Sequence, residues 1–354
     1  MQTFFIVAVL ALGFLVTFQI AKASEYVGIL RGEEKTKKQT NKINGFLLLM
    51  FLILGLIGVY FCNEQFKGRV LGEAASDHGI LIDRMLHITF ILTGVVFVIT
   101  QVALFWFAYK YQASEKRKAY YYPHNNKLEV IWTVIPAIAL TVLVGFGIFY
   151  WFKITGEAPQ GAQQVEIVGS QFKWEFRYPG NDKVLGKKYF KQISSENPMG
   201  QLWDDPYNHD DVYVSGEAMH LVVNKPVKLV IGSKDVIHDV GLVHFRMKMD
   251  AVPGTPTTMW FTPTKTTKQM IEETGNPKFV FEISCDQMCG QGHTGMRGEI
   301  IVESQEEFDA WMAQKKPKYF SVFPDKDPNA VKDTAAIKTI PVKDTAAIAQ
   351  LKTK

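Results

Sequence analysis

The residues with the clearest chemistry are two cysteines, a histidine and a methionine that lie within one short stretch. It reads Cys285-Asp-Gln-Met-Cys289-Gly-Gln-Gly-His293-Thr-Gly-Met296. Thiolate and thioether are soft donors, and imidazole binds copper as well as zinc and iron. The combination of sulfur, nitrogen and thioether favours copper, because zinc sites rarely use methionine. A mononuclear blue-copper site uses one cysteine, so the second cysteine allows a second copper ion that both sulfurs bridge.

Two simpler interpretations of the cysteine pair stay open at this point. The thiols could form a disulfide, or they could be buried beside a core methionine. A second imidazole would favour a metal, and Asp235-Val-Ile-His238 supplies one upstream. This histidine follows the strand-like run Val227–Ile231, so we expect it where a strand ends and a loop begins.

Together the two stretches resemble the binuclear copper (CuA) site of cytochrome c oxidase subunit II. That family has Cys-x3-Cys-x3-His-x2-Met after a distant histidine, and this sequence matches every ligand position. The resemblance extends from about residue 88 to residue 315. It implies two copper ions bound by side chains and by one backbone carbonyl, that of Gln287. The side-chain ligands would be His238, Cys285, Cys289, His293 and Met296.

The resemblance also implies a function and partners. The chain would be subunit II of a respiratory cytochrome c oxidase in a bacterial inner membrane, assembled with subunits I and III. It would accept single electrons from a cytochrome c or from a membrane-anchored haem c subunit. Oxygen would be reduced to water at haem groups of subunit I, with proton pumping. No Cys-x-x-Cys-His motif is present, so we expect no covalently attached haem on this chain.

One position departs from the commonest form of the family. The family usually has Glu where this sequence has Gln287, and that carboxylate helps to bind magnesium against subunit I. An amide oxygen is a weaker ligand than a carboxylate for a hard cation. Magnesium is therefore expected to bind loosely, or through other residues.

The elements that must position the ligands belong to a chain with two parts. The N-terminal part is strongly apolar, and the remainder has the composition of an ordinary globular domain. A length of 354 residues suggests two or three structural units. The net charge of +4 is too small and too dispersed to imply nucleic acid. We expect an N-terminal α-helical membrane region over residues 1–155, followed by an all-β cupredoxin-like sandwich over 156–316. Residues 317–354 are expected to form an extended tail.

Four apolar stretches reach or approach the length of about twenty residues that a membrane-spanning helix needs. They cover residues 3–21, 43–62, 88–109 and 130–152. Lysine and arginine are concentrated in the first and third connections, which places these in the cytoplasm and both termini in the periplasm. The family commonly has two spans, so the first pair is an addition.

A signal peptide is the alternative for the first stretch, because Ala21-Lys-Ala23 resembles a cleavage site. The absence of positive charge at its start, and an apolar run longer than usual, favour a span. The third cysteine, Cys62, lies alone at the edge of the second stretch, where we expect no special role.

The fourth stretch opens with Glu129 in the pattern Glu-x-x-Trp-Thr-x-x-Pro-Ala. The positive end of a helix dipole stabilises a carboxylate there, which alone would explain its position. The pattern also resembles the start of the family's second helix, whose glutamate lies at the cytoplasmic mouth of a proton path into subunit I. Glu129 is therefore a candidate proton-path entrance. Pro136 should kink this helix.

Aromatic residues alternate with charged ones over residues 172–178, which predicts a strand with one aromatic face. The aromatic residues are Phe172, Trp174, Phe176 and Tyr178, and core packing is their simplest explanation. The family has an aromatic segment Gln-Trp-x-Trp here, whose tryptophan is credited with electron entry. Phe172 takes that place in this sequence, so Phe172 and Trp174 are both candidates.

Further strands and a helix are expected around the copper loop. Residues 219–223 and 227–231 should pair with one another across Asn224-Lys-Pro. Residues 278–284 should deliver Cys285, residues 298–302 should follow Met296, and residues 306–314 should form a short helix. The tail repeats Val-Lys-Asp-Thr-Ala-Ala-Ile at 331–337 and 342–348, and is expected to lie on neighbouring subunits or to be disordered.

Acidic residues in the loop 181–217 are either a solvated surface or a surface that steers a basic electron donor. A further candidate lies in an Asp-Ala-x-Pro-Gly loop similar to that of the family. The candidate docking residues are Asp204, Asp205, Asp210, Asp211 and Asp250.

Other classes of protein share parts of this pattern. A quinol oxidase subunit II lacks the copper ligands, and nitrous oxide reductase carries the motif on a soluble enzyme, so neither fits. The remaining alternative is a membrane-tethered copper carrier or oxidase assembly factor. Such a protein exchanges its metal, so copper retention under mild chelation would separate the two functions.

Overall fold

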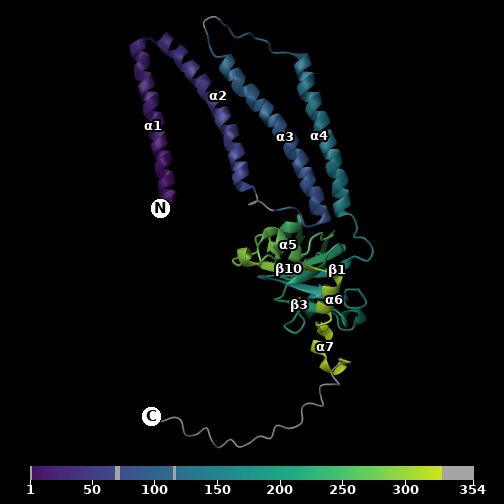
Figure 1. The fold of residues 1–354 in the computed structure, drawn as a ribbon. Helices are drawn as coiled ribbons and strands as arrows, with labels where there is room; N and C mark the ends of the chain where they lie inside the picture. The colour runs from purple at the N-terminus through teal and green to yellow at the C-terminus, as the bar shows by residue number, and fades with distance from the viewer. Residues whose placement is uncertain (1, 68–71, 115–116, 329–354) are drawn as a thin grey trace, which may run out of the picture. The chain divides into compact units, whose positions relative to one another are not determined.

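A computed structural model describes residues 2–67, 72–114 and 117–328 of the chain (Figure 1). The chain forms two compact units. One contains residues up to 72 together with 84–148, and the other contains 73–83 together with the residues from 149 onward. The repeated segment of the predicted tail lies outside the described residues.

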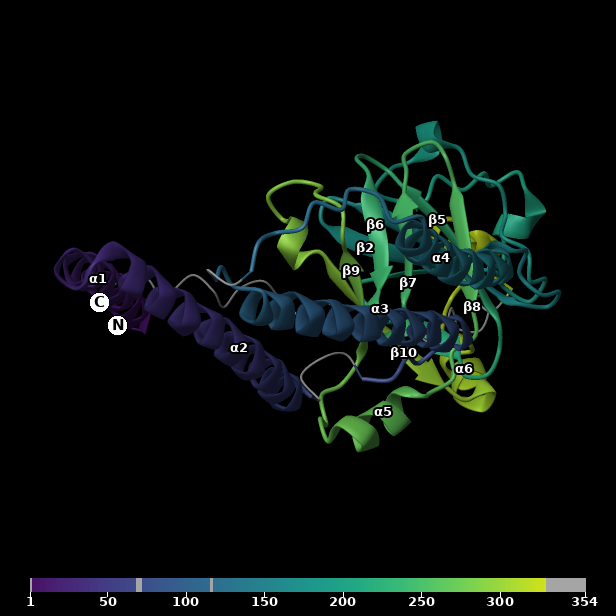
Figure 2. The same ribbon diagram turned by 90° about the horizontal axis from the view of Figure 1, so that it is seen from above.

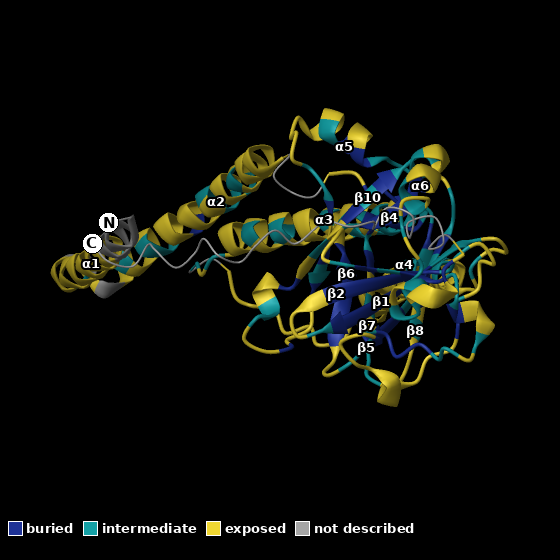
Figure 3. Ribbon diagram, turned by 90° about the horizontal axis from the view of Figure 1, so that it is seen from below, coloured by how far each residue is buried: buried dark blue, intermediate teal, exposed yellow. Residues whose placement is uncertain are grey.

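Long helices make up the first unit, and two of them continue into the second. They are α1 (Gln2–Arg31), α2 (Glu33–Phe66), α3 (Asp77–Lys110) and α4 (Asn126–Thr155). Among the described residues, α2, α3 and α4 are long and apolar enough to cross a membrane. Most of their residues are exposed, drawn in yellow in Figure 3, and the many apolar ones among them suit contact with lipid. Helix α1 contains the first predicted span, whose crossing of the membrane stays a prediction, as does the kink at Pro136 inside α4.

The second unit is a sandwich of two five-stranded sheets, with the orders β3-β2-β1-β5-β8 and β4-β10-β9-β6-β7. Figures 1 and 2 show this unit from two sides. The first sheet consists of β1 (Gln163–Ser170), β2 (Lys173–Tyr178), β3 (Val212–Ser215), β5 (Val227–Ser233) and β8 (Thr257–Phe261). The second consists of β4 (Met219–Val222), β6 (His238–Leu242), β7 (Met247–Ala251), β9 (Phe281–Cys285) and β10 (Arg297–Glu303).

Short helices connect and flank the strands. They are η1 (Phe190–Gln192), η2 (Pro206–Asn208), η3 (Val243–Phe245), α5 (Thr267–Thr274), η4 (His293–Gly295), α6 (Gln305–Met312), α7 (Lys318–Val322) and η5 (Pro324–Lys326). The predicted terminal helix corresponds to α6, where Ser304 and Glu307 form a reciprocal cap at the N-terminus.

The inner faces of the two sheets share one core, drawn in dark blue in Figure 3. Ile167 and Leu229 come from the first sheet and Leu242 and Ile283 from the second, and all four are fully buried. Sheets that pack face to face bury alternate residues of each strand. The predicted fold class, helices able to span a membrane followed by a cupredoxin-like sandwich, is confirmed.

The predicted pairing of residues 219–223 with 227–231 is wrong, because the two strands lie in different sheets. Strand β4 pairs in parallel with β10, whereas β5 pairs in parallel with β1 and antiparallel with β8. The connection contains Asn224 at a positive φ of 58°, which turns the chain from one sheet to the other. Every residue of β4 is buried, so this strand has no solvent face to present in a simple hairpin.

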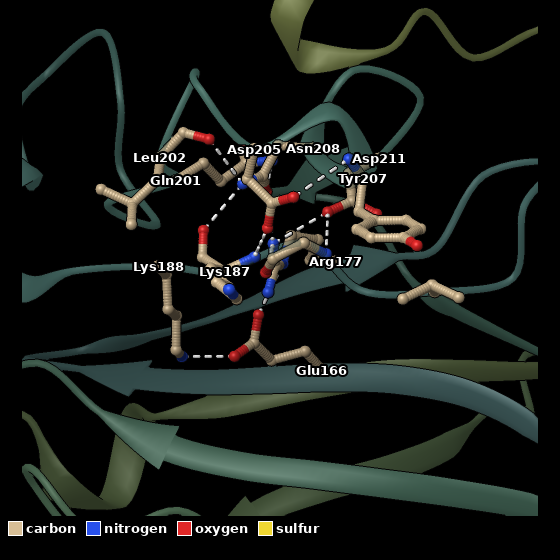
Figure 4. A network of polar contacts seen from close by, with 12 residues as sticks. Glu166, Arg177, Lys187, Lys188, Gln201, Leu202, Asp205, Tyr207, Asn208 and Asp211 are labelled. Carbon is tan, nitrogen blue, oxygen red and sulfur yellow. Dashed lines mark hydrogen bonds and ion pairs between the residues drawn. The ribbon is translucent and has the colours of Figure 1, made fainter.

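The predicted alternation of aromatic and charged residues is present in strand β2, and beyond the exposed Lys173 both faces of the strand are buried. Glu175 and Arg177 are as inaccessible as the aromatic residues. The segment 179–211 covers the outer face, and Figure 4 shows how Arg177 joins Glu166 of β1 to this segment. Burial of this kind is tolerated because each charge has a partner.

The sandwich extends beyond the predicted boundary at residue 316. Tyr319 of α7 is buried, stacks on His209 and contacts Trp203. At the other boundary, residues 73–83 belong to this unit, where Ala75 and His78 are buried. The tail therefore starts later than expected.

Candidate metal centre

The predicted ligands meet at one end of the second sheet. Strands β9 and β10 are antiparallel neighbours, so the loop between them starts and ends at the same place. A hydrogen bond of 3.2 Å from Cys285 N to Met296 O closes it. Strand β6 lies beside β9, with Val240 opposite Cys285. His238 is the first residue of β6, so the expectation that it lies where a strand ends and a loop begins is wrong.

The two sulfurs lie at the centre of the site. Cys285 Sγ and Cys289 Sγ are 3.7 Å apart, and both cysteines are free. Each sulfur has its own imidazole: Cys285 Sγ is 3.7 Å from His238 Nδ1, and Cys289 Sγ is 3.7 Å from His293 Nδ1. The site therefore has two equivalent halves, and the structure contains no disulfide there.

Weaker donors complete each half. The backbone oxygen of Gln287 is 3.2 Å from Cys285 Sγ, and Met296 Sδ is 4.0 Å from Cys289 Sγ. All five side-chain ligands predicted from the sequence, and the predicted carbonyl, are thus brought together. The donors are sulfur, imidazole nitrogen and one carbonyl, a soft set that suits copper.

Burial makes the site a poor place for free thiolates. His238, Cys289 and Met296 are nearly inaccessible to solvent. Burial, with the neighbouring Cys285 adding to it, raises the pKa of Cys289 to about 11. Without a metal the thiol keeps its proton, and metal binding must release it. The ligand atoms of His238, Cys285 and Cys289 lie within 4.8 Å of one another, so the residues fit a soft metal.

A carboxylate that the sequence analysis did not single out holds His238 in place. Asp235 Oδ1 is 2.8 Å from His238 Nε2, and it also accepts from Val236 N at 2.7 Å. Asp235 Oδ2 accepts from Gln171 N at 2.7 Å. Burial opposes the ionisation of Asp235, but the hydrogen bonds from Gln171 and His238 outweigh it and lower its pKa. The imidazole is thereby turned so that Nδ1 faces the sulfur. The spacing Asp-x-x-His in the sequence could have indicated this contact between Asp235 and His238.

Glycines and Phe172 shape the copper loop. A Cβ at Gly292 would lie 2.5 Å from the Phe172 ring, and a Cβ at Gly290 would lie 3.0 Å from it. Gly290 also has a φ of 135°, which side chains disfavour. The side chain of Gln171 donates to Cys289 O at 2.6 Å. The loop is thus held from outside by the segment that precedes β2.

The two candidates for electron entry lie at different depths. Trp174 is buried, and its ring centroid is 6.0 Å from that of His238, edge to face. Phe172 is 40% exposed over the copper loop. Met288, between the two cysteines, is 73% exposed, and Val236 and Ile237 next to His238 are exposed as well. Four apolar side chains are therefore exposed beside the ligands.

The predicted acidic docking residues are not one exposed cluster. Asp204 and Asp250 are exposed. Asp205 accepts from Tyr207 N and Lys187 N, and Asp210 accepts from Asp182 N. The prediction is wrong for Asp211, which is fully buried and binds Arg177 at 2.8 Å. A carboxylate that is already paired inside the fold cannot contact a partner.

Glu129 lies far along the chain from this centre, in the first turn of α4. Its side chain is exposed, and Asn125 caps the helix by accepting from Leu128 N at 3.1 Å. This position suits the helix dipole, and the proton-path role stays a prediction.

Comparisons with known proteins match both units. The family model described as the cytochrome c oxidase subunit II transmembrane domain matches residues 73–149, and that of the periplasmic domain matches 163–305. The alternative cytochrome c oxidase subunit 2 of Bradyrhizobium diazoefficiens is 37% identical over 235 residues, which is 66% of this chain and 80% of that protein. Cytochrome c oxidase subunit 2 of Cereibacter sphaeroides is 26% identical over 64% of this chain and 73% of that protein.

A solved structure is also similar. The crystal structure of the periplasmic domain of subunit II of cytochrome oxidase of Bradyrhizobium japonicum covers 46% of this chain and 99% of that chain. The sequence identity is 26% and the TM-score is 0.32.

Proposed function

Because this chain belongs to the cytochrome c oxidase subunit II family, we propose that it is the electron-entry subunit of a bacterial respiratory oxidase. It would receive single electrons from a cytochrome c-type donor and pass them to the haem groups of subunit I, where oxygen is reduced to water with proton pumping. The observation that carries the proposal is the pair of buried sulfurs 3.7 Å apart, each with its own histidine nitrogen.

Copper is the metal that these residues would hold. Cys285, Cys289, His238 and His293 would hold the copper, and Met296 and the carbonyl of Gln287 would be the weaker ligands. When bound, the pair of coppers supplies one-electron redox chemistry. The protein keeps the ligands rigid, because β6, β9 and β10 are hydrogen-bonded neighbours and Asp235 fixes His238. A rigid ligand set favours electron transfer, because little reorganisation accompanies it.

The electron donor would approach the apolar surface formed by Phe172, Val236, Ile237 and Met288. Met288 lies between the two bridging cysteines, and Phe172 covers the loop that carries His293. Trp174 lies beneath, edge-on to His238. Asp204, Asp205 and Asp210 belong to the segment 179–211 and would add long-range attraction for a basic donor.

In the membrane, we propose four spans with both termini in the periplasm, in accordance with the positive charge of the first and third connections. A periplasm-dependent reporter fused at the C-terminus should be active. A well-expressed fusion without activity would contradict this topology.

Glu129 would receive protons at the cytoplasmic start of α4. Glu129→Ala should slow proton uptake and oxygen turnover, while electron entry stays fast. Normal turnover in this variant would leave Glu129 the single role of stabilising the helix end.

Magnesium at the boundary to subunit I would bind weakly through Gln287, whose amide is a poor substitute for a carboxylate.

The decisive experiment follows electrons in the assembled oxidase after rapid mixing with reduced donor. Haem on subunit I should be reduced quickly in the wild type and in the Cys62→Ser control, and should stay oxidised in Cys285→Ser. Fast haem reduction in correctly assembled Cys285→Ser would overturn the proposal.

The carrier or assembly-factor alternative gives a different result in a second assay. A carrier releases copper to a mild chelator, whereas an electron relay keeps both ions.

A further inference from the structure

A cavity lies beside the C-terminal end of α4, in the second unit of the structure. It has a volume of about 680 Å³, which is within the usual range for sites that bind small molecules. Its lining comes mainly from the last residues of α4, from the linker 156–162 and from strands β5, β7 and β8. Every lining residue belongs to the second unit, so one compact unit forms the whole cavity.

The first sheet supplies one wall of the cavity. Lys228 of β5 lies opposite Trp260 of β8. Val227 and Leu229, on either side of Lys228, are fully buried in the core. By the alternation of a strand, Lys228 and Trp260 therefore face outward. The linker supplies another wall, and Trp260 Nε1 donates to Gly156 O at 2.7 Å. A hydrogen bond thus holds the two walls together.

Four charged side chains line the cavity, and they are of two kinds. Arg246 and Lys248 already form ion pairs with carboxylates, at 2.9 Å and 2.7 Å. Among the described residues, the side chains of Lys228 and Glu157 form no ion pair or hydrogen bond, either with another residue or with each other. Lys228 is half-buried, and Glu157 is exposed. The cavity therefore offers one free ammonium and one free carboxylate.

Helix α4 places the cavity at the membrane surface. Its 30 residues span about 45 Å at a rise of about 1.5 Å per residue, which matches the thickness of a bilayer including its headgroups. Trp151 near its end lines the cavity and is 64% exposed, and Lys153 lies in its last turn. Tryptophan and lysine at the end of a membrane-spanning helix lie at the level of the lipid headgroups. This depth favours a lipid headgroup as the occupant.

We propose that the cavity binds the headgroup of phosphatidylethanolamine, a phospholipid that carries one phosphate and one primary ammonium. The phosphate would contact Lys228, and the ammonium would contact Glu157. Hydrogen bonds between charged groups are the stronger kind. Phosphatidylglycerol has no ammonium for Glu157, and the quaternary ammonium of phosphatidylcholine has no N–H to donate. This site goes beyond the proposed electron-transfer function and does not rest on it.

A bound headgroup would join two segments of the chain. Glu157 belongs to the linker that follows α4, and Lys228 belongs to β5. The lipid would therefore strengthen the connection that Trp260 makes between the linker and the sheet.

Native mass spectrometry of the full-length chain in detergent tests the site. The chain is mixed with equal amounts of phosphatidylethanolamine, phosphatidylglycerol and phosphatidylcholine that have the same acyl chains, so that only the headgroup differs. Lipids also bind along the apolar helices, but this background is common to the wild type and the variants and cancels when they are compared. The wild type should retain phosphatidylethanolamine in preference to the other two lipids.

Three variants and a control separate the contributions of the two charges. Lys228→Met should weaken the retention of phosphatidylethanolamine about tenfold, because a hydrogen bond to a charged group is lost. Lys228→Arg keeps the charge and should bind like the wild type. Glu157→Gln should remove most of the preference over phosphatidylcholine, because the carboxylate is gone. Lys268→Met, which is exposed and outside the cavity, should bind like the wild type.

Equal retention of the three lipids by the wild type, or a preference for phosphatidylglycerol, overturns the proposal. Wild-type retention in Lys228→Met overturns it as well, and so does an unchanged preference in Glu157→Gln. The melting temperature of each variant shows whether it is folded, and neither side chain belongs to the core.

Discussion

The paired strands β1 and β2 support a buried polar cluster at each end, and the two clusters are built in opposite ways. At one end Gly169 lies opposite Trp174, and a Cβ on Gly169 would lie 2.9 Å from the His238 ring, so this end supports the metal centre. Three residues along, Glu166 lies opposite Arg177, and this end anchors the segment 179–211 (Figure 4).

The Arg177 cluster supplies its own partners. Arg177 Nε is 2.6 Å from Glu166, and Nη1 donates to Gly186 O, Asn208 Oδ1 and Asp211 Oδ2 within 3.0 Å. Lys188 forms a further ion pair with Glu166. These are ordinary hydrogen-bond lengths.

The metal centre leaves space between its donors. Its sulfurs and ring nitrogens are separated by 3.7 Å, which is too far for strong hydrogen bonds and suits atoms that share a metal. The comparison teaches that the charges of one cluster pair with one another inside the fold, whereas the donors of the other are spaced to fit a metal.

Breaking the Arg177 cluster should have the largest effect on stability. Arg177→Met leaves Glu166 and Asp211 buried without their main partner, so we expect the free energy of unfolding to fall by about 3–5 kcal/mol. The melting temperature of the full chain in detergent measures this. Lys268→Met is the matched control, because its ion pair with Glu307 is exposed to solvent and should contribute little to stability. Equal melting temperatures for the two variants would show that the buried Arg177 cluster contributes no more to stability than an exposed ion pair.

Weakening the support of the metal centre should change copper affinity more than folding. Asp235→Asn keeps a hydrogen bond to His238 but removes the charge, and outer carboxylates of this kind contribute about 10–100-fold to metal affinity. Competition with a copper chelator measures the change, and Asp204→Asn serves as the control. The same copper affinity in both variants would show that Asp235 does not support the ligand.

The pH dependence of stability tests whether Asp211 keeps its proton in the folded state. Burial raises its pKa to about 7 despite Arg177, and within the described residues its Oδ1 has no partner. The folded state then holds a proton that the unfolded state releases near pH 4, so stability falls as pH rises from about 4 to about 7. As the pH rises from about 4 to about 7, the melting temperature of Asp211→Asn should therefore increase relative to that of the wild type. A constant difference would refute the raised pKa.

The smallest effect is expected at Gln287, because any residue supplies a backbone carbonyl. Gln287→Ala should keep both coppers by metal analysis. Loss of copper from a folded Gln287→Ala chain would make the side chain a ligand or an essential support.

Sequence reasoning identified the candidate ligands that the fold brings together, because their types and spacing are local. Cys285, Cys289, His293 and Met296 are contained in one loop, and His238 completes the pattern. It placed the strands on both sides of this loop for the same reason, since apolar alternation is a local signal.

What the sequence did not reveal depends on contacts between distant segments. Asp211 was predicted to be part of a solvated or docking surface, and only the folded segment 179–211 shows that it is buried and paired with Arg177. The assignment of β4 and β5 to different sheets depends on pairing with β10 and β1, which no local pattern specifies.

Electron paramagnetic resonance of the oxidised, copper-loaded chain tests the central claim most directly. Two equivalent sulfur–imidazole halves predict one unpaired electron coupled equally to two copper nuclei. The Cys62→Ser variant should give the same spectrum, and replacement of either Cys285 or Cys289 by Ser should abolish it. A spectrum with coupling to a single copper nucleus in the wild type would contradict the account.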